Sequence, residues 1–209
     1  MKILNLYAGI GGNRKLWGDE HEITAVENKK HVAKVYKKLF PKDKVVIGDA
    51  HKYLLKHYKE FDFIWSSPPC PSHSRLNYPA FAKGKVRFPD MKLYEEIIFL
   101  KWCFKGNWVV ENVISYYDPL IKPKLLGRHY YWSNFFIDKI KQHINDDIAN
   151  ATINKLQEYH NIDLSKFKTE NKRLMLRNAV NPKHGLHIFN CAFKTQQNSL
   201  CQYSKEVQK

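Results

Sequence analysis

The sequence predicts an α/β protein built around one mostly parallel sheet. Along roughly the first two-thirds of the chain, short apolar stretches alternate with helix-like ones, which is the pattern of parallel strands joined by crossover helices. A glycine-rich turn directly follows the first expected strand, as it does in folds that bind a nucleotide cofactor. With 209 residues, of which 44% are hydrophobic, the chain is long enough for one domain with a sizeable core.

The individual elements follow from residue composition and turn signals. Strands are expected where β-branched, aromatic and other apolar residues cluster, at 3–7, 22–27, 44–47, 61–65, 108–111 and 130–137. Helices are expected between and after these strands, at 14–17, 30–40, 51–58, 91–104 and 181–193. The polar segment 138–172 is expected to hold a helix near 146–159 and little else. We therefore expect a single domain over 1–193, followed by a polar tail over 194–209.

The chain is strongly basic, with a formal net charge of +15 at pH 7. Such an excess favours a polyanionic partner such as nucleic acid, because binding releases condensed counterions. A lysine-rich, well-solvated surface would give the same composition, so the charge alone does not identify the partner.

The composition also argues against several classes of protein. No apolar run approaches the length of a membrane span and no signal peptide precedes the first strand, so we expect a cytoplasmic protein without membrane contact. No metal site is expected, because the ten histidines form no HxxxH pattern and the cysteines form no CxxC pair. We expect no disulfide framework among the four cysteines, Cys70, Cys103, Cys191 and Cys201.

Three polar or glycine-rich features end the first three expected strands. The sequence LNLYAGIGG ends at Gly12, and its glycines let the backbone approach a ligand closely. Glu27 ends the second strand, where a carboxylate accepts hydrogen bonds from ribose hydroxyls. Asp49 ends the third and is suited to accept from an adenine amino group. Each carboxylate alone could simply start a helix, but the three together predict an adenosine-type cofactor. No GxxxxGK[ST] loop is present, which disfavours nucleoside triphosphate hydrolysis.

The fourth expected strand runs into the sequence SSPPCPSHS, which contains Cys70. Pro68 and Pro69 stiffen this turn and fix the direction of the thiol. A single cysteine is most often a small buried hydrophobe, but the polar residues that follow are not typical of a core. A thiol at this edge of a basic protein is expected to have its thiolate form favoured, which predicts a nucleophile.

The fifth expected strand ends in a carboxylate, Glu111, which is expected at the same edge of the sheet as Cys70. Glu111 follows Trp108-Val109-Val110 and is a candidate acid or base, although a capping or ion-paired glutamate would look the same.

Taken in order, these motifs resemble those of the cytosine carbon-5 DNA methyltransferases, and the phage and prophage members most of all. The resemblance rests on the glycine turn, Glu27, Asp49, Pro-Pro-Cys at 68–70 and Glu-Asn-Val at 111–113. The loop sequence RFPDM and a late Arg-Asn-Ala-Val, which resembles the usual Gly-Asn-Ala-Val, add to it. It covers roughly 3–137 and 173–193. It implies a Rossmann-like S-adenosylmethionine-dependent methyltransferase fold with helices on both faces of the sheet, and a single catalytic domain.

The resemblance also implies a mechanism. Cys70 would attack carbon 6 of a flipped-out cytosine while Glu111 holds or protonates ring nitrogen 3. Carbon 5 would then take the methyl group from S-adenosylmethionine, after which its proton and Cys70 leave. Asn112 would support the catalytic loop. Arg128 matches the last arginine of the family's Gln-x-Arg-x-Arg motif, whose earlier positions hold Lys124 and Leu126.

The same resemblance implies two sets of binding residues. The cofactor is expected to contact Tyr7, Ala8, Gly9, Gly11, Gly12, Glu27, Asn28, Asp49, Ala50, Pro68, Asn178 and Val180. The expected partner is double-stranded DNA, contacted by Ser72, Ser74, Arg75, Lys83, Lys85 and Arg87.

Three further features depart from the family pattern. Pro71 replaces the usual glutamine after the cysteine, and Arg177 replaces the usual glycine of the last motif. Only 138–172 is left for a target-recognition insert, which is therefore reduced. Recognition could fall to the loop 71–89, could be relaxed to a short site with phosphate contacts carrying the affinity, or could be supplied by a partner protein.

Other functions remain open on the sequence alone. An RNA cytosine methyltransferase would use the same chemistry, and a catalytically silent nucleic-acid-binding protein would keep the same fold. An amino-group methyltransferase would need an aromatic residue after Ser67-Pro68-Pro69, where this chain has Cys70. The biological setting could be restriction–modification, protection of a mobile genome or regulation.

Overall fold

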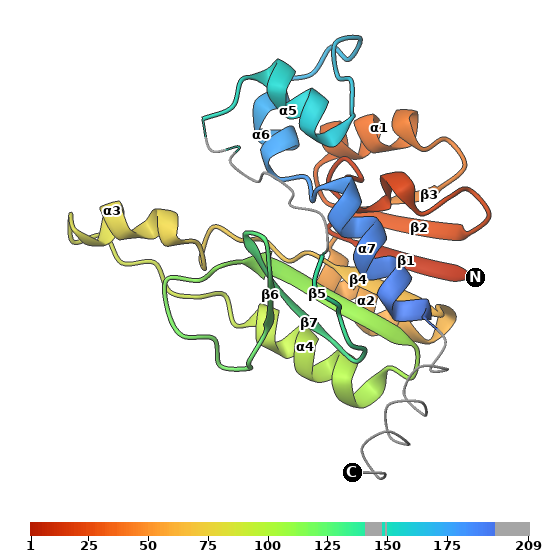
Figure 1. The fold of residues 1–209 in the computed structure, drawn as a ribbon, viewed down its shortest axis with the longest axis horizontal. Helices are drawn as coiled ribbons and strands as arrows, with labels where there is room; N and C mark the ends of the chain where they lie inside the picture. The colour runs from red at the N-terminus through yellow and green to blue at the C-terminus, as the bar shows by residue number, and fades with distance from the viewer. Residues whose placement is uncertain (141–147, 149, 195–209) are drawn as a thin grey trace, which may run out of the picture.

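The computed structural model describes residues 1–140, 148 and 150–194. Within this part of the chain the strands form a seven-stranded sheet in the order β3-β2-β1-β4-β5-β7-β6 (Figure 1). The pairs among β1 to β5 are parallel, whereas β7 runs antiparallel to both β5 and β6. The expected mostly parallel α/β architecture is confirmed. The strands are β1 (Lys2–Leu6), β2 (Glu22–Glu27), β3 (Lys44–Ile47), β4 (Phe63–Ser66), β5 (Asn107–Val113), β6 (Lys124–Leu126) and β7 (His129–Ser133).

The helices lie mainly between successive parallel strands, as crossover connections require. The α-helices are α1 (Lys30–Leu39), α2 (Ala50–His57), α3 (Tyr78–Phe81), α4 (Lys92–Cys103), α5 (Ile153–His160), α6 (Lys172–Arg177) and α7 (Pro182–Phe193). Short 3-10 helices are η1 (Asn13–Leu16), η2 (Tyr58–Glu60) and η3 (Arg75–Asn77).

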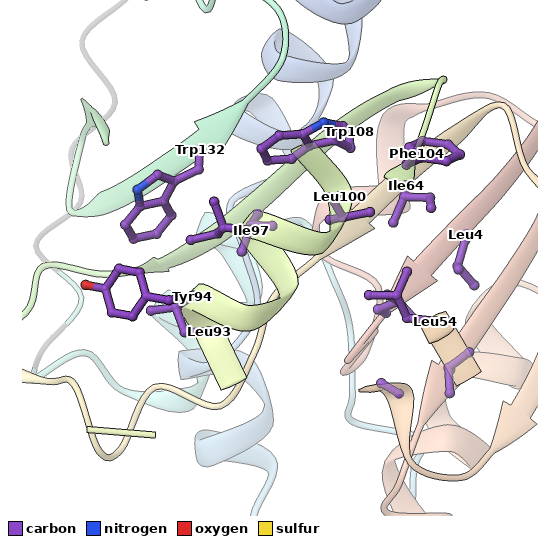
Figure 2. Packing of buried hydrophobic residues seen from close by; sticks show 14 residues of the cluster. Leu4, Leu54, Ile64, Leu93, Tyr94, Ile97, Leu100, Phe104, Trp108 and Trp132 are labelled. Atoms are coloured by element: carbon purple, nitrogen blue, oxygen red, sulfur yellow. The ribbon is translucent and has the colours of Figure 1, made fainter. Parts of the chain in front are cut away.

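Alternate residues of the strands point to opposite faces of the sheet, and each face is covered by its own helices. Leu4 packs in a cluster with residues of α2 and α4, including Leu54 and Leu100 (Figure 2). Its neighbour Ile3 packs on the other face with Trp17 and with Ile188 of α7. Helices therefore cover both faces, as expected.

Several expected boundaries need correction. The strand expected over 130–137 ends at Ser133, because the Asn134 side chain turns away to accept from the Trp108 amide and to donate to the Gly106 carbonyl. Strand β6, helix α6 and the helical turns of the loop after Cys70 were not expected. The segment expected as a helix over 14–17 is the 3-10 helix η1.

The last third of the chain is only partly described. The helix expected near 146–159 is α5, which begins after Thr152, whose hydroxyl caps it by accepting from the Lys155 amide. Residues 146, 147 and 149, which the expected helix included, lie outside the described residues, as does the tail from 195 onward. Leu156 and Leu164 pack in one cluster with Val35 of α1, the helix that connects β2 to β3.

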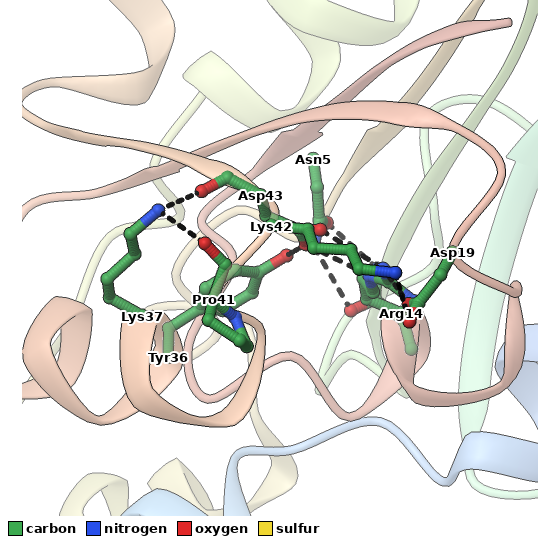
Figure 3. Close-up of polar contacts among 9 residues, drawn as sticks. Asn5, Arg14, Asp19, Tyr36, Lys37, Pro41, Lys42 and Asp43 are labelled. Atoms are coloured by element: carbon green, nitrogen blue, oxygen red, sulfur yellow. Dashed lines mark hydrogen bonds and ion pairs between the residues drawn. The ribbon is translucent and has the colours of Figure 1, made fainter.

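A buried ion pair fixes the glycine turn to the loop before β3 (Figure 3). The Arg14 guanidinium donates to both carboxylate oxygens of Asp43, at 2.9 and 3.0 Å, and also to Asp19. The hydroxyl of Tyr36 donates to Asp43 at 2.7 Å. Because removal of one partner would leave a buried charge unpaired, this cluster locks two distant loops in one arrangement.

The C-terminal helix closes onto the glycine turn. A Cβ at Gly12 would lie 2.3 Å from the Val180 carbonyl oxygen, and one at Gly185 would lie 2.3 Å from the Asn13 carbonyl oxygen. Only glycine fits at these two points.

Candidate active site

A pocket of about 230 Å³ lies at the carboxyl ends of the parallel strands β1 to β4. This is the edge at which open α/β sheets bind their ligands. The pocket is lined by Tyr7, Glu27, Asn28, Gly48, Asp49, Ala50, His51, Pro68, Pro69, His73, Asp90, Lys92 and Leu93.

The backbone turns sharply where β1 enters the pocket. Tyr7 adopts a left-handed conformation, with φ of +53°, which is uncommon for a bulky residue and is found where the surroundings enforce it. Its hydroxyl donates to the Glu96 carboxylate at 2.6 Å. Burial, and secondarily the Glu96 carboxylate, raise the pKa of Tyr7, so the phenol stays protonated.

Glu96 organises this side of the pocket from helix α4. Its fully buried carboxylate also bonds the His51 Nδ1 at 3.0 Å and accepts from the Ser66 hydroxyl at 2.7 Å. The three partners come from the end of β1, the start of α2 and the end of β4. One carboxylate thus holds three walls of the pocket together, and no signal in the sequence alone indicated it.

Glu27 is held in place by main-chain donors. Its Oε2 accepts from the Gly9 amide at 3.0 Å and its Oε1 from the Lys29 amide at 2.9 Å. The glycine turn therefore positions the carboxylate that ends β2, as the sequence order suggested. Each carboxylate oxygen keeps a further lone pair available to a ligand.

Asp49 caps helix α2 rather than ending β3. Its side chain accepts from the Lys52 amide at 3.0 Å, and this hydrogen bond is the main cause that lowers its pKa. The carboxylate is therefore ionised at neutral pH and faces the same pocket as Glu27.

The residues expected to bind the cofactor fall into two groups. Tyr7, Glu27, Asn28, Asp49, Ala50 and Pro68 line the pocket. The other six are not among its lining residues: Ala8, Gly9, Gly11, Gly12, Asn178 and Val180. Of these, Gly9 orients Glu27 and Gly12 packs on Val180.

Sequence reasoning missed the pocket residues contributed by α4 and by the Cys70 loop. Lys92 and Leu93 come from the start of α4, which is far along the chain from the strand ends. His51, Pro69 and His73 adjoin motifs that were identified, so their proximity in the sequence was a usable signal.

Cys70 follows β4 in a tight turn in which its carbonyl accepts from the His73 and Ser74 amides. Burial raises the pKa of its thiol, and the Glu111 carboxylate raises it further. The expectation that the thiolate is favoured is therefore wrong for the protein alone, because partial burial beside an acidic group outweighs the basic composition. Because the Glu111 carboxylate contributes to the raised pKa of Cys70, the two groups lie close enough to interact electrostatically.

Glu111 lies buried in β5, next to the strand that carries Cys70. His129 of β7 approaches it, with Nε2 at 3.6 Å from Oε1. The adjacent Asn112 donates from its side chain to the Pro68 carbonyl at 3.0 Å and is itself buried. Asn112 thereby ties the Pro-Pro-Cys turn to β5.

Arg128 stands in the turn between β6 and β7 and is exposed. It belongs to the same hairpin as His129, whereas Leu126 is buried beneath that hairpin.

Residues 71–91 form an arm that projects beside the sheet and carries α3 (Figure 1). We call this segment the arm. The segment after β5 supports it: the Tyr116 amide donates to the His73 carbonyl, Arg75 Nε to the Ser115 carbonyl, and the Tyr116 hydroxyl to the Arg87 carbonyl.

The arm presents a basic and apolar surface. Arg75, Lys83, Lys85 and Arg87 are all exposed. Leu76, Val86 and Phe88 are each more than 70% exposed, an unusual share for large apolar side chains. Ser72 and Ser74, which were expected to contact DNA, instead accept from the Asp90 and Leu76 amides within the arm.

Within the described residues, no helix is long and apolar enough to cross a membrane. The same part of the chain holds no cluster of three metal-binding side chains.

The fold and the pocket define an α/β protein with the Rossmann-like sheet of S-adenosylmethionine-dependent methyltransferases, with its ligand edge between β3 and β5. Residues 1–86 match the model of the family described as C-5 cytosine-specific DNA methylase. The resemblance seen in the motifs is thereby confirmed over a part of the chain that includes the glycine turn and Cys70. No curated protein matches the sequence.

Among solved structures, the chain is similar to a DNMT2 variant from Spodoptera frugiperda, at 29% identity over 54% of this chain and 35% of that one, with a TM-score of 0.39. It is also similar to a SAM-dependent methyltransferase from Agrobacterium tumefaciens, at 15% identity over 56% and 40% of the two chains, with a TM-score of 0.42. A putative DNA modification methyltransferase encoded within an Escherichia coli prophage gives 18% identity over 56% and 33%, with a TM-score of 0.39. The match spans well under half the length of each of these structures.

Proposed function

We propose that this protein is a DNA (cytosine-5-)-methyltransferase that moves a methyl group from S-adenosylmethionine to carbon 5 of a flipped-out cytosine. The observation that carries the proposal is the placement of Cys70 in the turn after β4 and of Glu111 in the adjacent strand β5, beside a pocket lined by Glu27 and Asp49. The family match over residues 1–86 supports the cytosine carbon-5 chemistry.

In this proposal the pocket binds S-adenosylmethionine. Glu27 accepts hydrogen bonds from the ribose hydroxyls, and Asp49 accepts from the adenine amino group. The rigid mounting of both carboxylates supports these roles, because preorganised acceptors lose little freedom when the cofactor binds.

Cys70 and Glu111 share one proton in the proposed first step. Transfer of the thiol proton to Glu111 removes the repulsion between a thiolate and a carboxylate, which is the second cause of the raised pKa of Cys70. The thiolate forms a bond to carbon 6, and the protonated Glu111 gives its proton to ring nitrogen 3. No proton is gained or lost overall, and carbon 5 becomes electron-rich.

S-adenosylmethionine, held by Glu27 and Asp49, would supply the methyl group to carbon 5. The carbon-5 proton is lost to solvent and the carbon–sulfur bond breaks, so that Cys70 leaves as a thiolate. The proton on ring nitrogen 3 returns through Glu111 to that thiolate, which restores the aromatic ring and the starting state of both residues. Asn112 keeps the Pro-Pro-Cys turn in register with β5 throughout, through its bond to the Pro68 carbonyl.

The arm is the proposed DNA-binding surface. Its four exposed basic residues suit phosphate contacts, and it begins one residue after the proposed nucleophile. In the described part of the segment between β7 and α6, Leu156, Ile162 and Leu164 pack in a cluster with residues of α1, so we assign target recognition mainly to the arm. We place the protein in the cytoplasm, where its substrate would be chromosomal or phage DNA, and we assign Arg128 to that substrate.

The proposal is tested by incubating the purified protein with S-adenosylmethionine and mixed-sequence duplex DNA, then digesting the DNA to nucleosides for mass spectrometry. We expect 5-methylcytosine. Methylated adenine would contradict the assigned chemistry. A product on RNA but none on DNA would contradict the substrate, and no product on either would favour a silent nucleic-acid-binding protein.

A further inference from the structure

One buried polar atom in the cofactor pocket is unexplained by the contacts within the protein. His73 is 1% exposed, yet its Nε2 has no hydrogen-bond partner among the residues that the structure describes. Its side chain lines the pocket. An unpaired buried nitrogen is costly, so its presence at the wall of a ligand pocket points to a ligand atom as the missing partner.

The hydrogen bonds behind His73 decide whether this nitrogen donates or accepts. The Leu120 amide can only donate, and it donates to the Tyr94 hydroxyl at 3.2 Å. The Tyr94 hydroxyl donates in turn to the Tyr117 hydroxyl at 3.4 Å, and Tyr117 lies 2.6 Å from the His73 Nδ1. Each phenol has one proton, and the arrangement that leaves no hydroxyl proton of this chain without an acceptor directs the proton of Tyr117 to Nδ1. The His73 proton is therefore on Nε2, the nitrogen without a partner, which is a donor.

The ionisation states agree with this arrangement. Burial is the main cause that lowers the pKa of His73, so the ring is neutral and carries one proton at neutral pH. Burial, followed by the contact with Tyr94, raises the pKa of Tyr117, so its hydroxyl keeps the proton that it donates.

The rest of the pocket indicates which part of a ligand supplies the acceptor. Pro68, Pro69 and Leu93 give it apolar surfaces suited to the faces of a planar base, and Asp49 supplies an acceptor. An adenine presents an amino donor next to ring-nitrogen acceptors, which is the complement of one fixed acceptor and one fixed donor.

We propose that His73 is a cofactor-binding residue that donates a hydrogen bond from Nε2 to a ring nitrogen of the adenine of the bound cofactor, while Asp49 accepts from the amino group. The inference rests on the proposed function, because it takes the pocket as the S-adenosylmethionine site. Tyr117 is the positioning residue that fixes the tautomer and the ring orientation of His73.

Two matched substitutions of His73 test the roles of its two ring nitrogens separately. In His73→Asn the side-chain carbonyl can still accept from Tyr117, but no donor reaches the position of Nε2. In His73→Gln the amide nitrogen reaches that position. We expect His73→Asn to weaken binding of both S-adenosylhomocysteine and adenosine about tenfold, and His73→Gln to stay within about threefold of the wild type. Titration calorimetry of the full-length protein measures both ligands.

Thermal unfolding without ligand shows whether each variant is folded. If His73→Asn does not fold, Tyr117→Phe takes its place. This variant keeps the aromatic ring of residue 117 but removes the hydroxyl that fixes the tautomer of His73, and we expect both ligands to bind about threefold more weakly.

The other outcomes contradict the inference in distinguishable ways. Wild-type affinity for both ligands in folded His73→Asn, or in Tyr117→Phe if it has to replace that variant, would overturn the role of His73 while leaving the proposed function intact. Weaker binding of S-adenosylhomocysteine with unchanged adenosine affinity would move the acceptor to the amino-acid part of the cofactor and overturn the adenine assignment. A wild-type protein that binds neither ligand would overturn the proposed function, and the inference with it.

Discussion

The cofactor pocket and the arm lie side by side, but they are held in different ways. The pocket walls are fixed by buried side chains, above all by the Glu96 carboxylate and its three partners. The arm is fixed chiefly by hydrogen bonds with the segment after β5, in which main-chain carbonyls of both segments accept, while its four basic side chains remain exposed. Buried polar networks are costly to disturb, whereas exposed side chains can change freely. The comparison predicts that substitutions in the pocket affect stability and cofactor binding, and that those at the exposed basic residues of the arm affect nucleic-acid binding alone.

The largest expected effect is on turnover, and it concerns Cys70, which lies between the pocket and the arm. Cys70→Ser should lower turnover by about four orders of magnitude or more, because the hydroxyl is a far weaker nucleophile at neutral pH. Affinity for S-adenosylhomocysteine should stay within about twofold, since Cys70 does not line the pocket. Methyl transfer to DNA and calorimetric binding measure the two quantities. Wild-type-like activity in this variant would refute the nucleophile assignment.

The next effect concerns the pocket network. Glu96→Ala should lower the free energy of unfolding by about 3–5 kcal/mol, because it leaves the Tyr7 hydroxyl, His51 and the Ser66 hydroxyl without their buried partner. The matched control is Glu95→Gln, one residue earlier on the exposed side of α4, which should change it by less than about 0.5 kcal/mol. Urea unfolding followed by circular dichroism measures both. Equal effects would mean that the carboxylate does not organise the pocket.

A smaller effect is expected in the arm. The double substitution of Lys83 and Lys85 by alanine should weaken duplex DNA binding about tenfold at low salt and make its dependence on log salt concentration shallower by about two units. Unfolding free energy should not change, because both side chains are exposed. Fluorescence anisotropy over a salt series measures the slope. As a matched control, Lys30→Ala together with Lys34→Ala on α1 should leave the slope unchanged, and an equal loss there would show that the arm is not the binding surface.

The smallest expected effect tests whether the Glu111 carboxylate contributes to the raised pKa of the Cys70 thiol. Burial and the Glu111 carboxylate both disfavour the thiolate, so alkylation of Cys70 by iodoacetamide should accelerate as pH rises toward the raised pKa of the thiol. Glu111→Gln removes the negative charge and should shift the profile to lower pH, giving about threefold faster alkylation near pH 8. Peptide mass spectrometry assigns the modified cysteine. An unchanged profile would mean that burial alone sets the pKa.

The sequence predicted the sheet well because each parallel strand is a compact apolar segment bounded by turn residues. Strands β2 and β3 have the bounds expected, and β1, β4 and β5 are displaced by a residue or two. Strand β6 was missed because three residues, Lys-Leu-Leu, carry no usable periodicity. Its pairing with β7 depends on a tight turn at Gly127, whose φ is +58°, and so on tertiary structure.

The candidate site was predictable in part, because residues at the ends of adjacent parallel strands meet at one edge. Glu27, Cys70 and Glu111 followed from that rule. Glu96 did not, since a glutamate on a helix is normally exposed and only the packing of α4 buries it. The ionisation of Cys70 also escaped sequence reasoning, because overall charge says little about the immediate surroundings of one thiol.

The contact between the glycine turn and the C-terminal helix has a consequence for biosynthesis. Gly12 packs on Val180, and Asn13 packs on Gly185, so the glycine turn finds these partners only after all seven described strands of the sheet have been synthesised. A nascent chain that has emerged as far as α4 holds most of the sheet, but it lacks the surface against which the turn beside the cofactor pocket closes. Binding of the proposed cofactor should therefore require that α7 has been synthesised and has packed on the glycine turn.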